Sequence, residues 1–440
     1  MRISIKVKNS ALNMVGGALP GLIGLVALPE ILAEHGDVFL GIYMLQIALL
    51  FVLSLTDLGV SRAMMLVKFD EQVNPGAMIG PPFAVAKTLV FKLSIWSALV
   101  VGLINVLFLS QSNQNDIAVA NFALIMAGLI SLNILPHRGV LELEGRFLLL
   151  NVIRGLSACV IYVAPLMFDK NTSALFLKTA LVILCARIVT YQAYRVVTLG
   201  QSKIYSSDMI LELKEVMFSR AKWVGLTNIL SLGLTFVDRY IVAVVVSVGA
   251  VASYTLATEL STKVWLITGA VMSAVNPGIA SNYFSKLNPG DSMIRIEKWI
   301  IYFSIIFPVI LFILNSQRLV ELWLKDSLAE SVGYIAVILL VGISVNSLSQ
   351  LNFSLLQLAG REKVGAYLQI YGFFGLVVMA SILGFTYGVV GVACAFSIRL
   401  ILDALAVSYL VSLEKSIKKP ISIYELMFVV FSLSTLVVTL

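Results

Sequence analysis

Long apolar stretches separated by short polar ones make up almost the whole chain. A helix needs about 20 predominantly apolar residues to cross the hydrocarbon core of a bilayer. The pattern therefore predicts twelve transmembrane helices, at residues 11–33, 38–58, 84–109, 117–136, 147–168, 174–196, 223–247, 250–275, 297–315, 331–355, 364–386 and 388–412. A thirteenth apolar segment, 423–440, is barely long enough to span, and the pattern leaves its placement open.

Composition supports lipid as the solvent of this chain. Hydrophobic residues make up 59% of the sequence and charged residues 12%, whereas soluble domains carry about 25% charged residues. The basic start resembles a signal peptide, but the apolar run from Ala11 to Leu32 is long enough to span and no small-residue cleavage site follows it. We expect an all-α polytopic membrane protein whose first apolar run is a permanent helix.

The longest polar connection, residues 197–222, divides the predicted helices into two sets of six. This division predicts an N-terminal bundle at 1–200, a connector at 201–221, a C-terminal bundle at 222–414, and a basic turn with the uncertain apolar segment at 415–440. Charged residues alternate with apolar ones in the connector, a pattern typical of an amphipathic helix on the membrane surface. Two six-helix bundles of equal orientation favour a transporter with a central cavity.

Loop charges predict the orientation of the helices. Of the 31 Lys and Arg residues, about twenty lie on the side of the N-terminus, while the other side holds Lys170, Arg318 and Lys325. Short cytoplasmic loops carry the excess of positive charge in membrane proteins. The N-terminus is therefore predicted to be cytoplasmic, and the net charge of +7 reflects topology and does not indicate nucleic-acid binding.

Eight cations fall inside the predicted helices, where each costs at least roughly 2.5–3.5 kcal/mol near the bilayer centre. They are Lys87, Lys92, Arg154, Lys178, Arg187, Arg239, Lys263 and Arg399. Three have an acid close by in sequence, and for these the alternative is mutual neutralisation that fixes helix packing: Lys263 with Glu259, Arg399 with Asp403, and Arg239 with Asp238. Lys87 and Lys178 lie near helix ends and can reach the headgroups.

Three cations remain: Lys92, Arg154 and Arg187. They have no acid within one helical turn, and all lie in the first six predicted helices. They predict a cavity whose positive charge comes mainly from the N-terminal bundle. Arginine presents a planar donor fork that suits phosphate oxygens, and Arg187 shares a helix face with Tyr191 and Tyr194. The candidates for contact with a diphosphate or an acidic sugar are, in order, Arg154, Arg187, Lys92 and Lys87, followed by Arg239, Lys263 and Arg399.

Other polar residues within the spans have two interpretations each. Asn346 and Gln350 belong to a run of amides and hydroxyls that either lines a path for a sugar or joins helices by hydrogen bonds. The glycines and prolines of the first helix either allow close packing or let the helix bend as a gate. The candidates for ion coupling or gating are the acids Asp57, Asp238, Glu259 and Asp403.

No enzyme motif is present. The sequence lacks a phosphate-binding glycine loop and zinc-ligand spacing, its three cysteines lie in apolar spans, and His35 and His137 fall in different predicted loops. A polymerase or ligase would need a sizeable outer loop, and the longest one, about residues 315–330, is short. We expect no cofactor and no metal. The segment Leu141–Arg146, with its two glutamates, is interpreted as a solvated loop.

Four segments resemble the Wzx-type O-antigen flippases of the multidrug/oligosaccharidyl-lipid/polysaccharide exporter superfamily. The motifs are LPEIL with FLGIYML (Leu28–Leu45), LSLTDLGVSRA (Leu53–Ala63), FVDRYIVAVVVSVGAVASYTLATEL with VNPGIA (Phe236–Ala280), and LLQLAGREK (Leu355–Lys363). The resemblance covers most of the chain.

The resemblance implies a flippase of the bacterial inner membrane. Its substrate would be an undecaprenyl-diphosphate-linked oligosaccharide, moved from the cytoplasmic to the periplasmic leaflet by alternating access. Because the sequence has no ATP-binding motif, an ion gradient is the expected energy source. A polysaccharide polymerase and a chain-length regulator would be its protein partners, and membrane lipid its surroundings. The alternative is a cation- or proton-coupled multidrug exporter. Related drug exporters often carry a coupling acid in the first or tenth helix, where this chain has only Glu30 at a helix end.

Overall fold

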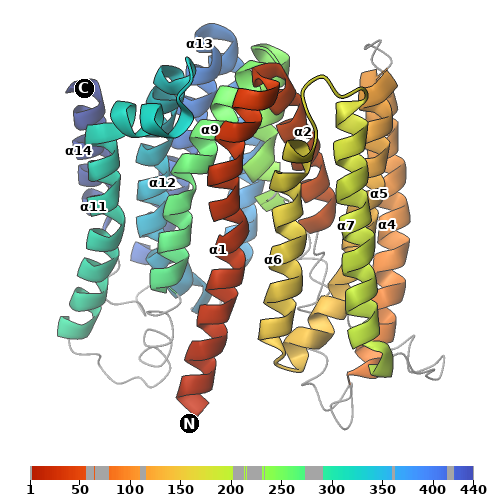
Figure 1. Cartoon of the computed structure of the whole chain (residues 1–440). Coiled ribbons are helices and arrows are strands. Elements are labelled where there is room, and N and C mark those ends of the chain that lie inside the picture. The colour runs from red at the N-terminus through yellow and green to blue at the C-terminus, as the bar shows by residue number, and fades with distance from the viewer. Residues whose placement is uncertain are drawn as a thin grey trace. The chain divides into compact units, whose positions relative to one another are not determined.

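The computed structural model describes residues 2–55, 64, 79–109, 115–201, 213, 215, 230–231, 233–272, 291–358, 362–413 and 421–439. Among them no β-strand occurs (Figure 1). The α-helices are α1 (Arg2–His35), α2 (Asp37–Leu55), α4 (Gly80–Leu109), α5 (Asn115–Leu143), α6 (Phe147–Val163), α7 (Leu175–Val197), α9 (Ala250–Ser261), α11 (Asp291–Leu324), α12 (Ala329–Leu358), α13 (Glu362–Leu413) and α14 (Ile423–Thr439). Residues 233–245 are also helical.

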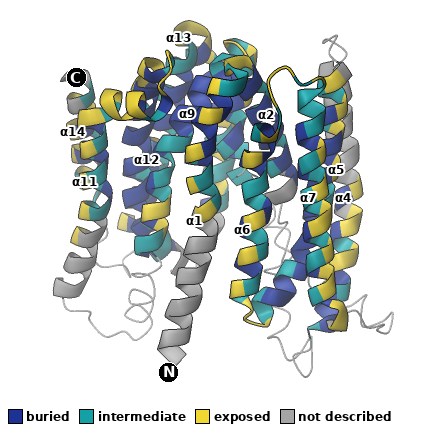
Figure 2. Cartoon of the chain, in the orientation of Figure 1, coloured by how far each residue is buried: buried dark blue, intermediate teal, exposed yellow. Residues whose placement is uncertain are grey.

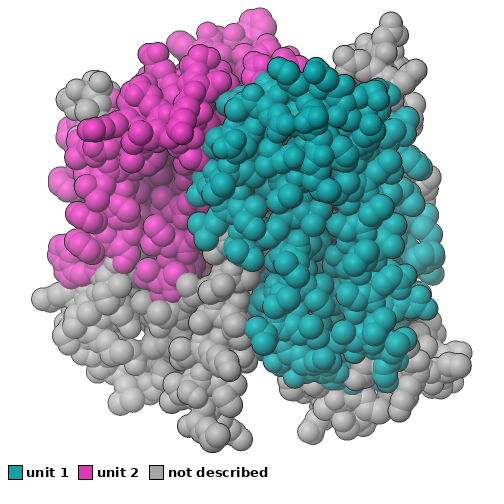
Figure 3. All heavy atoms as spheres, in the orientation of Figure 1, with its two compact units in different colours: residues 1–36, 43–236 teal, residues 37–42, 237–440 magenta. Residues whose placement is uncertain are grey.

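The chain divides into two compact units (Figure 3). Unit 1 comprises residues 1–36 and 43–236, and unit 2 comprises residues 37–42 and 237–440. The start of α2 belongs with unit 2 because it lies against residues 248–251: a Cβ on Gly41 would be 2.1 Å from the carbonyl oxygen of Val248. Most of the predicted connector at 201–221 lies outside the described residues.

In unit 1, α5 packs against both α4 and α7, and α1 packs against α6. Small residues permit the close approaches. A Cβ on Gly24 of α1 would lie 2.9 Å from the ring of Tyr162 on α6, and one on Gly128 of α5 would lie 2.6 Å from Cβ of Leu53. Glycines let membrane helices approach closely, so at Gly24 the packing interpretation accounts for the residue.

In unit 2, α12 is the central helix and packs against α9, α11, α13 and α14. In the most apolar window of α12, 78% of the residues are buried, against 22% in that of α11. The difference is visible as the predominantly dark ribbon of α12 in Figure 2. Membrane-exposed helices keep an apolar outer face toward the acyl chains, whereas a central helix is covered by protein.

Two long helices are broken where the pattern predicted that spans end. Gly388 interrupts α13 with φ 62 and ψ −143, a conformation that is accessible mainly to glycine, and it separates the two helices expected at 364–386 and 388–412. Asn315 interrupts α11 with φ −124 and ψ 15, at the predicted end of the span 297–315. These two predictions are confirmed.

Six helices of the described residues are long and apolar enough to cross a membrane, and one of them, Gly365–Leu413, contains the break at Gly388. The chain is a multi-pass membrane protein with an all-α fold, as predicted. The predicted boundary at Pro136 was wrong. α5 continues to Leu143, so the first half of the segment interpreted as a solvated loop is helix, and His137 lies within α5 and not in a loop.

Candidate functional site

A pocket of about 310 Å³, which we call the arginine pocket, lies within unit 1. It is formed by α1, α2, α5, α6 and α7. It is lined by Pro20, Phe51, Ser131, Ile134, Leu135, Arg138, Arg154, Ser157, Ala158, Tyr162, Arg187, Thr190 and Tyr194. The lining contains three arginines and no acidic residue. Its charge is therefore positive, and it is set into helices that are otherwise apolar.

The three arginines come from three different helices: Arg138 from α5, Arg154 from α6 and Arg187 from α7. Nε of Arg138 donates a 2.9 Å hydrogen bond to Glu142, one turn further along α5. Within the described part of the chain, neither Arg154 nor Arg187 forms an ion pair. Two guanidinium groups thus bring uncompensated charge to one small pocket.

Arg187 is held in place by a neutral partner. Its Nη1 donates a 2.8 Å hydrogen bond to Oγ of Ser157 on α6, while its Nε is buried and has no hydrogen-bond partner among the described residues. A buried donor without an acceptor costs about 1–3 kcal/mol or more when it is charged. An anion in the pocket would supply the missing acceptor.

Three hydroxyl groups of the lining already donate to backbone carbonyls. Oγ of Ser131 donates to Ala127 at 2.8 Å, Oγ1 of Thr190 donates to Ala186 at 2.7 Å, and the Tyr194 hydroxyl donates to Leu150 at 3.3 Å. The guanidinium groups are the charged donors of the lining, and they can bind an anion. Charge-assisted hydrogen bonds of this kind are roughly twice as strong as neutral ones.

The structure does not bring every predicted cation into this pocket. Lys87 and Lys92 are exposed on α4 and do not line it. Tyr194 lines the pocket, whereas Tyr191 turns to the ring of His137, with 5.7 Å between ring centroids. His137 is buried and forms a 2.6 Å hydrogen bond with Oγ1 of Thr198. It ties α5 to the end of α7.

The buried charges of unit 2 form ion pairs and hydrogen bonds. Lys263 lies 2.8 Å from Glu259, and Arg239 lies 3.6 Å from the other oxygen of the same carboxylate. On α13, Nη2 of Arg399 lies 2.7 Å from Oδ2 of Asp403. The predicted pairs Glu259–Lys263 and Arg399–Asp403 are therefore confirmed.

Asp238 differs from the expectation that it simply neutralises Arg239. Its Oδ1 accepts a 2.8 Å hydrogen bond from the backbone N–H of Arg239, and its Oδ2 accepts a 2.7 Å bond from the hydroxyl of Tyr254. The guanidinium of Arg239 extends to Glu259 instead. Residues sixteen positions apart thus meet across the turn between the helix 233–245 and α9, a relationship that adjacency in sequence does not predict.

The polar run of α12 contains a strong interhelical joint. Asn352 donates to Oγ of Ser408 on α13 and to the carbonyl of Ile421, both at 2.8 Å, and accepts from the N–H of Ile421 at 3.0 Å. Here hydrogen bonding between helices accounts for the Asn352 amide.

The structure leaves the other polar candidates without a defined role. Asn346 and Gln350 are half-buried on α12, and Asp57 lies outside the described residues.

No protein-family model matches the chain. A curated protein of Shigella flexneri named "Putative O-antigen transporter" is 26% identical over 416 residues, covering 92% of this chain and 97% of that protein. Among solved structures, the lipid II flippase MurJ in an inward closed conformation has a TM-score of 0.70 at 13% identity, covering 97% of both chains. An inward-facing MATE multidrug transporter of the MOP superfamily has a TM-score of 0.64 at 15% identity, covering 98% of both.

The chain therefore shares its fold with these flippase and transporter structures. The resemblance stated from its motifs is confirmed, and the similar proteins named here are transporters or flippases, not enzymes.

Of the three arginines that line the pocket, Arg138 was not among the predicted site residues. Arg138 lies outside the predicted span 117–136, among the cations expected on the side of the N-terminus. Pro136 instead lies inside α5, where neighbouring helices can re-satisfy the freed backbone group. The signal that was overlooked is the spacing of Arg138 and Glu142, because residues four apart pair on a helix.

Proposed function

We propose that this protein is a flippase that moves a polyprenyl-diphosphate-linked oligosaccharide, such as an O-antigen repeat unit, from the cytoplasmic to the periplasmic leaflet by alternating access driven by an ion gradient. The observation that carries the proposal is the convergence of Arg138, Arg154 and Arg187 on a pocket whose lining holds no acid. In this proposal the pocket binds the diphosphate, and the N-terminus is cytoplasmic.

The chemistry of the pocket suits a diphosphate. Guanidinium groups bind phosphate oxygens through paired N–H donors, and unpaired arginines inside a membrane protein are costly unless they meet an anion or water. A volume of about 310 Å³ accommodates a compact charged group better than a whole oligosaccharide. The sugars and the polyprenyl chain would therefore lie outside this pocket.

The names of similar proteins support the substrate class. The curated relative is named for O-antigen, and the solved structure is named as a flippase of a lipid, lipid II. The multidrug alternative fits the pocket less well, because a site for cationic compounds needs negative or neutral polar groups. All charged residues in this lining are cations.

The unit 2 acids keep the role of candidates for coupling in this proposal. Glu259 lies 2.8 Å from Lys263, and Asp403 lies 2.7 Å from Arg399. Asp238 accepts a hydrogen bond from Tyr254. A coupling ion acts by stabilising one conformation over another. Protonation of one of these carboxylates would release its partner and so change the balance between conformations.

The proposal is tested in a strain that lacks its own O-antigen flippase. Arg154→Gln and Arg187→Gln are each expected to lower surface polysaccharide by tenfold or more, because each loses charge-assisted hydrogen bonds worth about 1.5–3 kcal/mol. The control is Arg146→Gln, since Arg146 is exposed in the turn after α5 and lies 3.6 Å from Glu144. All variants are compared at equal membrane abundance.

Unchanged surface polysaccharide in both pocket variants would contradict the anion site. Export of cationic drugs by the wild-type protein, together with failure to restore surface polysaccharide, would favour the multidrug alternative.

A further inference from the structure

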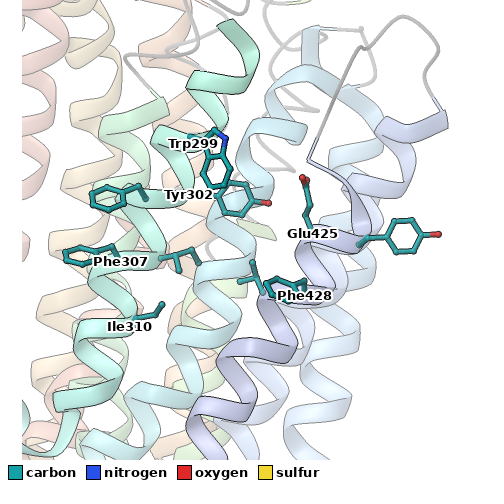
Figure 4. Close-up of a pocket in the computed structure, with 10 residues that line it drawn as sticks. Trp299, Tyr302, Phe307, Ile310, Glu425 and Phe428 are labelled. Carbon is teal, nitrogen blue, oxygen red and sulfur yellow. The ribbon is translucent and has the colours of Figure 1, made fainter. Parts of the chain in front are cut away.

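A second pocket lies in unit 2, between α11 and α14, and the proposed transport reaction does not use it (Figure 4). Its volume of about 860 Å³ is in the range of about 300–1,000 Å³ that is typical of ligand sites. It is lined by Trp299, Tyr302, Phe303, Ile306, Phe307, Ile310, Tyr424, Glu425, Phe428 and Val429. Nine of these ten residues are aromatic or aliphatic, so the pocket is suited to an amphiphile.

The aromatic side chains of this pocket are exposed on the surface of unit 2. Trp299 is 68% exposed, Phe303 67% and Phe428 70%. The helix that carries most of them includes the candidate span Tyr302–Leu324. Within a membrane such a surface faces acyl chains, so an amphiphile of the bilayer can reach the pocket directly. The bilayer itself is therefore the source of the occupant.

One end of the pocket is polar. Glu425 is the charged residue of the lining. Figure 4 places it at the same end as Trp299 and Tyr302, whose rings lie 6.4 Å apart, whereas Phe307 and Ile310 lie further along α11. The hydroxyl oxygen of Tyr302 is buried and has no hydrogen-bond partner in the described residues. A carboxylate beside two aromatic rings is a favourable environment for an ammonium group.

Glu425 also begins α14. Its Oε2 accepts a 2.9 Å hydrogen bond from the N–H of Ser422, and Oγ of Ser422 accepts a 3.2 Å bond from the N–H of Glu425. This reciprocal pair is a capping box. It fixes the carboxylate at the mouth of the pocket, and a glutamine can make the same bond. The charge of Glu425 can therefore be removed without removing the cap.

We propose that the pocket binds a membrane phospholipid with an amine headgroup, of the phosphatidylethanolamine type. The ammonium group lies between Glu425 and the rings of Trp299 and Tyr302, and one acyl chain follows α11 past Phe307 to Ile310. The eight residue steps from Tyr302 to Ile310 span about 12 Å of helix, enough for the first part of an acyl chain. A lipid with a net negative headgroup is disfavoured because Glu425 repels it.

The test uses the full-length protein purified in detergent and exposed to equal amounts of phosphatidylethanolamine and phosphatidylglycerol, with bound lipid counted by native mass spectrometry. The wild type is expected to retain phosphatidylethanolamine with at least about fivefold preference. Glu425→Gln should abolish the preference while total bound lipid stays similar. The control is Glu330→Gln, which changes an exposed acid in the first turn of α12.

A second variant separates the aromatic contribution from folding. Trp299→Leu keeps an apolar surface residue that is largely exposed, so it should leave the fold intact and reduce the preference. Equal retention of the two lipids by the wild type would overturn the proposal. So would an unchanged preference in Glu425→Gln, and neither result depends on whether the arginine pocket binds a diphosphate.

Discussion

The hydroxyl of Tyr254 donates a 2.7 Å hydrogen bond to the carboxylate of Asp238, and both side chains are completely buried. A buried carboxylate is tolerated when its oxygens accept hydrogen bonds. Asp238 accepts a second bond from the backbone N–H of Arg239. The pair therefore joins α9 to the helical residues 233–245 through groups that have no access to water.

Removing the hydroxyl should destabilise unit 2. Tyr254→Phe leaves Oδ2 of Asp238 without this donor, and a buried acceptor that loses its partner costs about 1–3 kcal/mol. We expect a lower unfolding temperature in detergent, measured by a thermal-shift assay. Tyr409→Phe is the matched control, because Tyr409 is 56% exposed. Equal unfolding temperatures for the two variants would show that the bond contributes nothing.

Glu259 should be more important for stability than Lys263. The Glu259 carboxylate lies between two cations, 3.6 Å from Arg239 and 2.8 Å from Lys263. Glu259→Gln leaves those cations facing a neutral amide, and breaking a buried pair costs about 3–5 kcal/mol. Lys263→Gln keeps the contact between Arg239 and Glu259. Denaturation of the two variants in detergent should rank them in that order, and the reverse order would refute the arrangement.

Ser157 should position Arg187 in the arginine pocket. Ser157→Ala removes the acceptor of the 2.8 Å hydrogen bond from Nη1 of Arg187, so the guanidinium loses its fixed orientation. We expect the proposed flippase activity to fall by about tenfold or more, at the scale of one charge-assisted hydrogen bond of about 1.5–3 kcal/mol, with little change in unfolding temperature. The measurement is surface polysaccharide in the complemented strain. Ser412→Ala, on an exposed part of α13, should leave it unchanged.

The contact between α12 and α13 should not tolerate a side chain at Gly342. A Cβ there would lie 2.6 Å from Cα of Ser397, so Gly342→Ala forces the helices apart at a cost of about 1–3 kcal/mol. Gly375→Ala is the control on α13, since nothing lies within 4 Å of its added Cβ. Thermal unfolding in detergent should separate the two alanine variants clearly.

Features that depend on local sequence were predictable here. The apolar pattern predicted the breaks at Gly388 and near Asn315, because each ends a stretch long enough to cross a bilayer. The pairs Glu259–Lys263 and Arg399–Asp403 follow from four-residue spacing on a helix. Helix geometry alone determines these relationships.

Features that depend on tertiary packing were not predictable. The predicted span ended at Pro136, yet α5 continues past it and carries Arg138 into the pocket. Similarly, no periodicity indicates that Tyr254 reaches Asp238 or that Tyr191 turns to His137. In each case the deciding contact joins residues on different helices or on opposite sides of a predicted boundary, where a single sequence carries no distance information.

The joint made by Asn352 has a mechanical consequence. Its side-chain amide satisfies both the N–H and the carbonyl of Ile421, as a neighbouring backbone strand would, and also holds Ser408. Sliding or rotating the start of α14 against α12 would break several buried hydrogen bonds at once. In any rearrangement between transport states, the start of α14 should therefore move together with α12 and the adjoining part of α13 as one rigid body, with the bending confined to other segments.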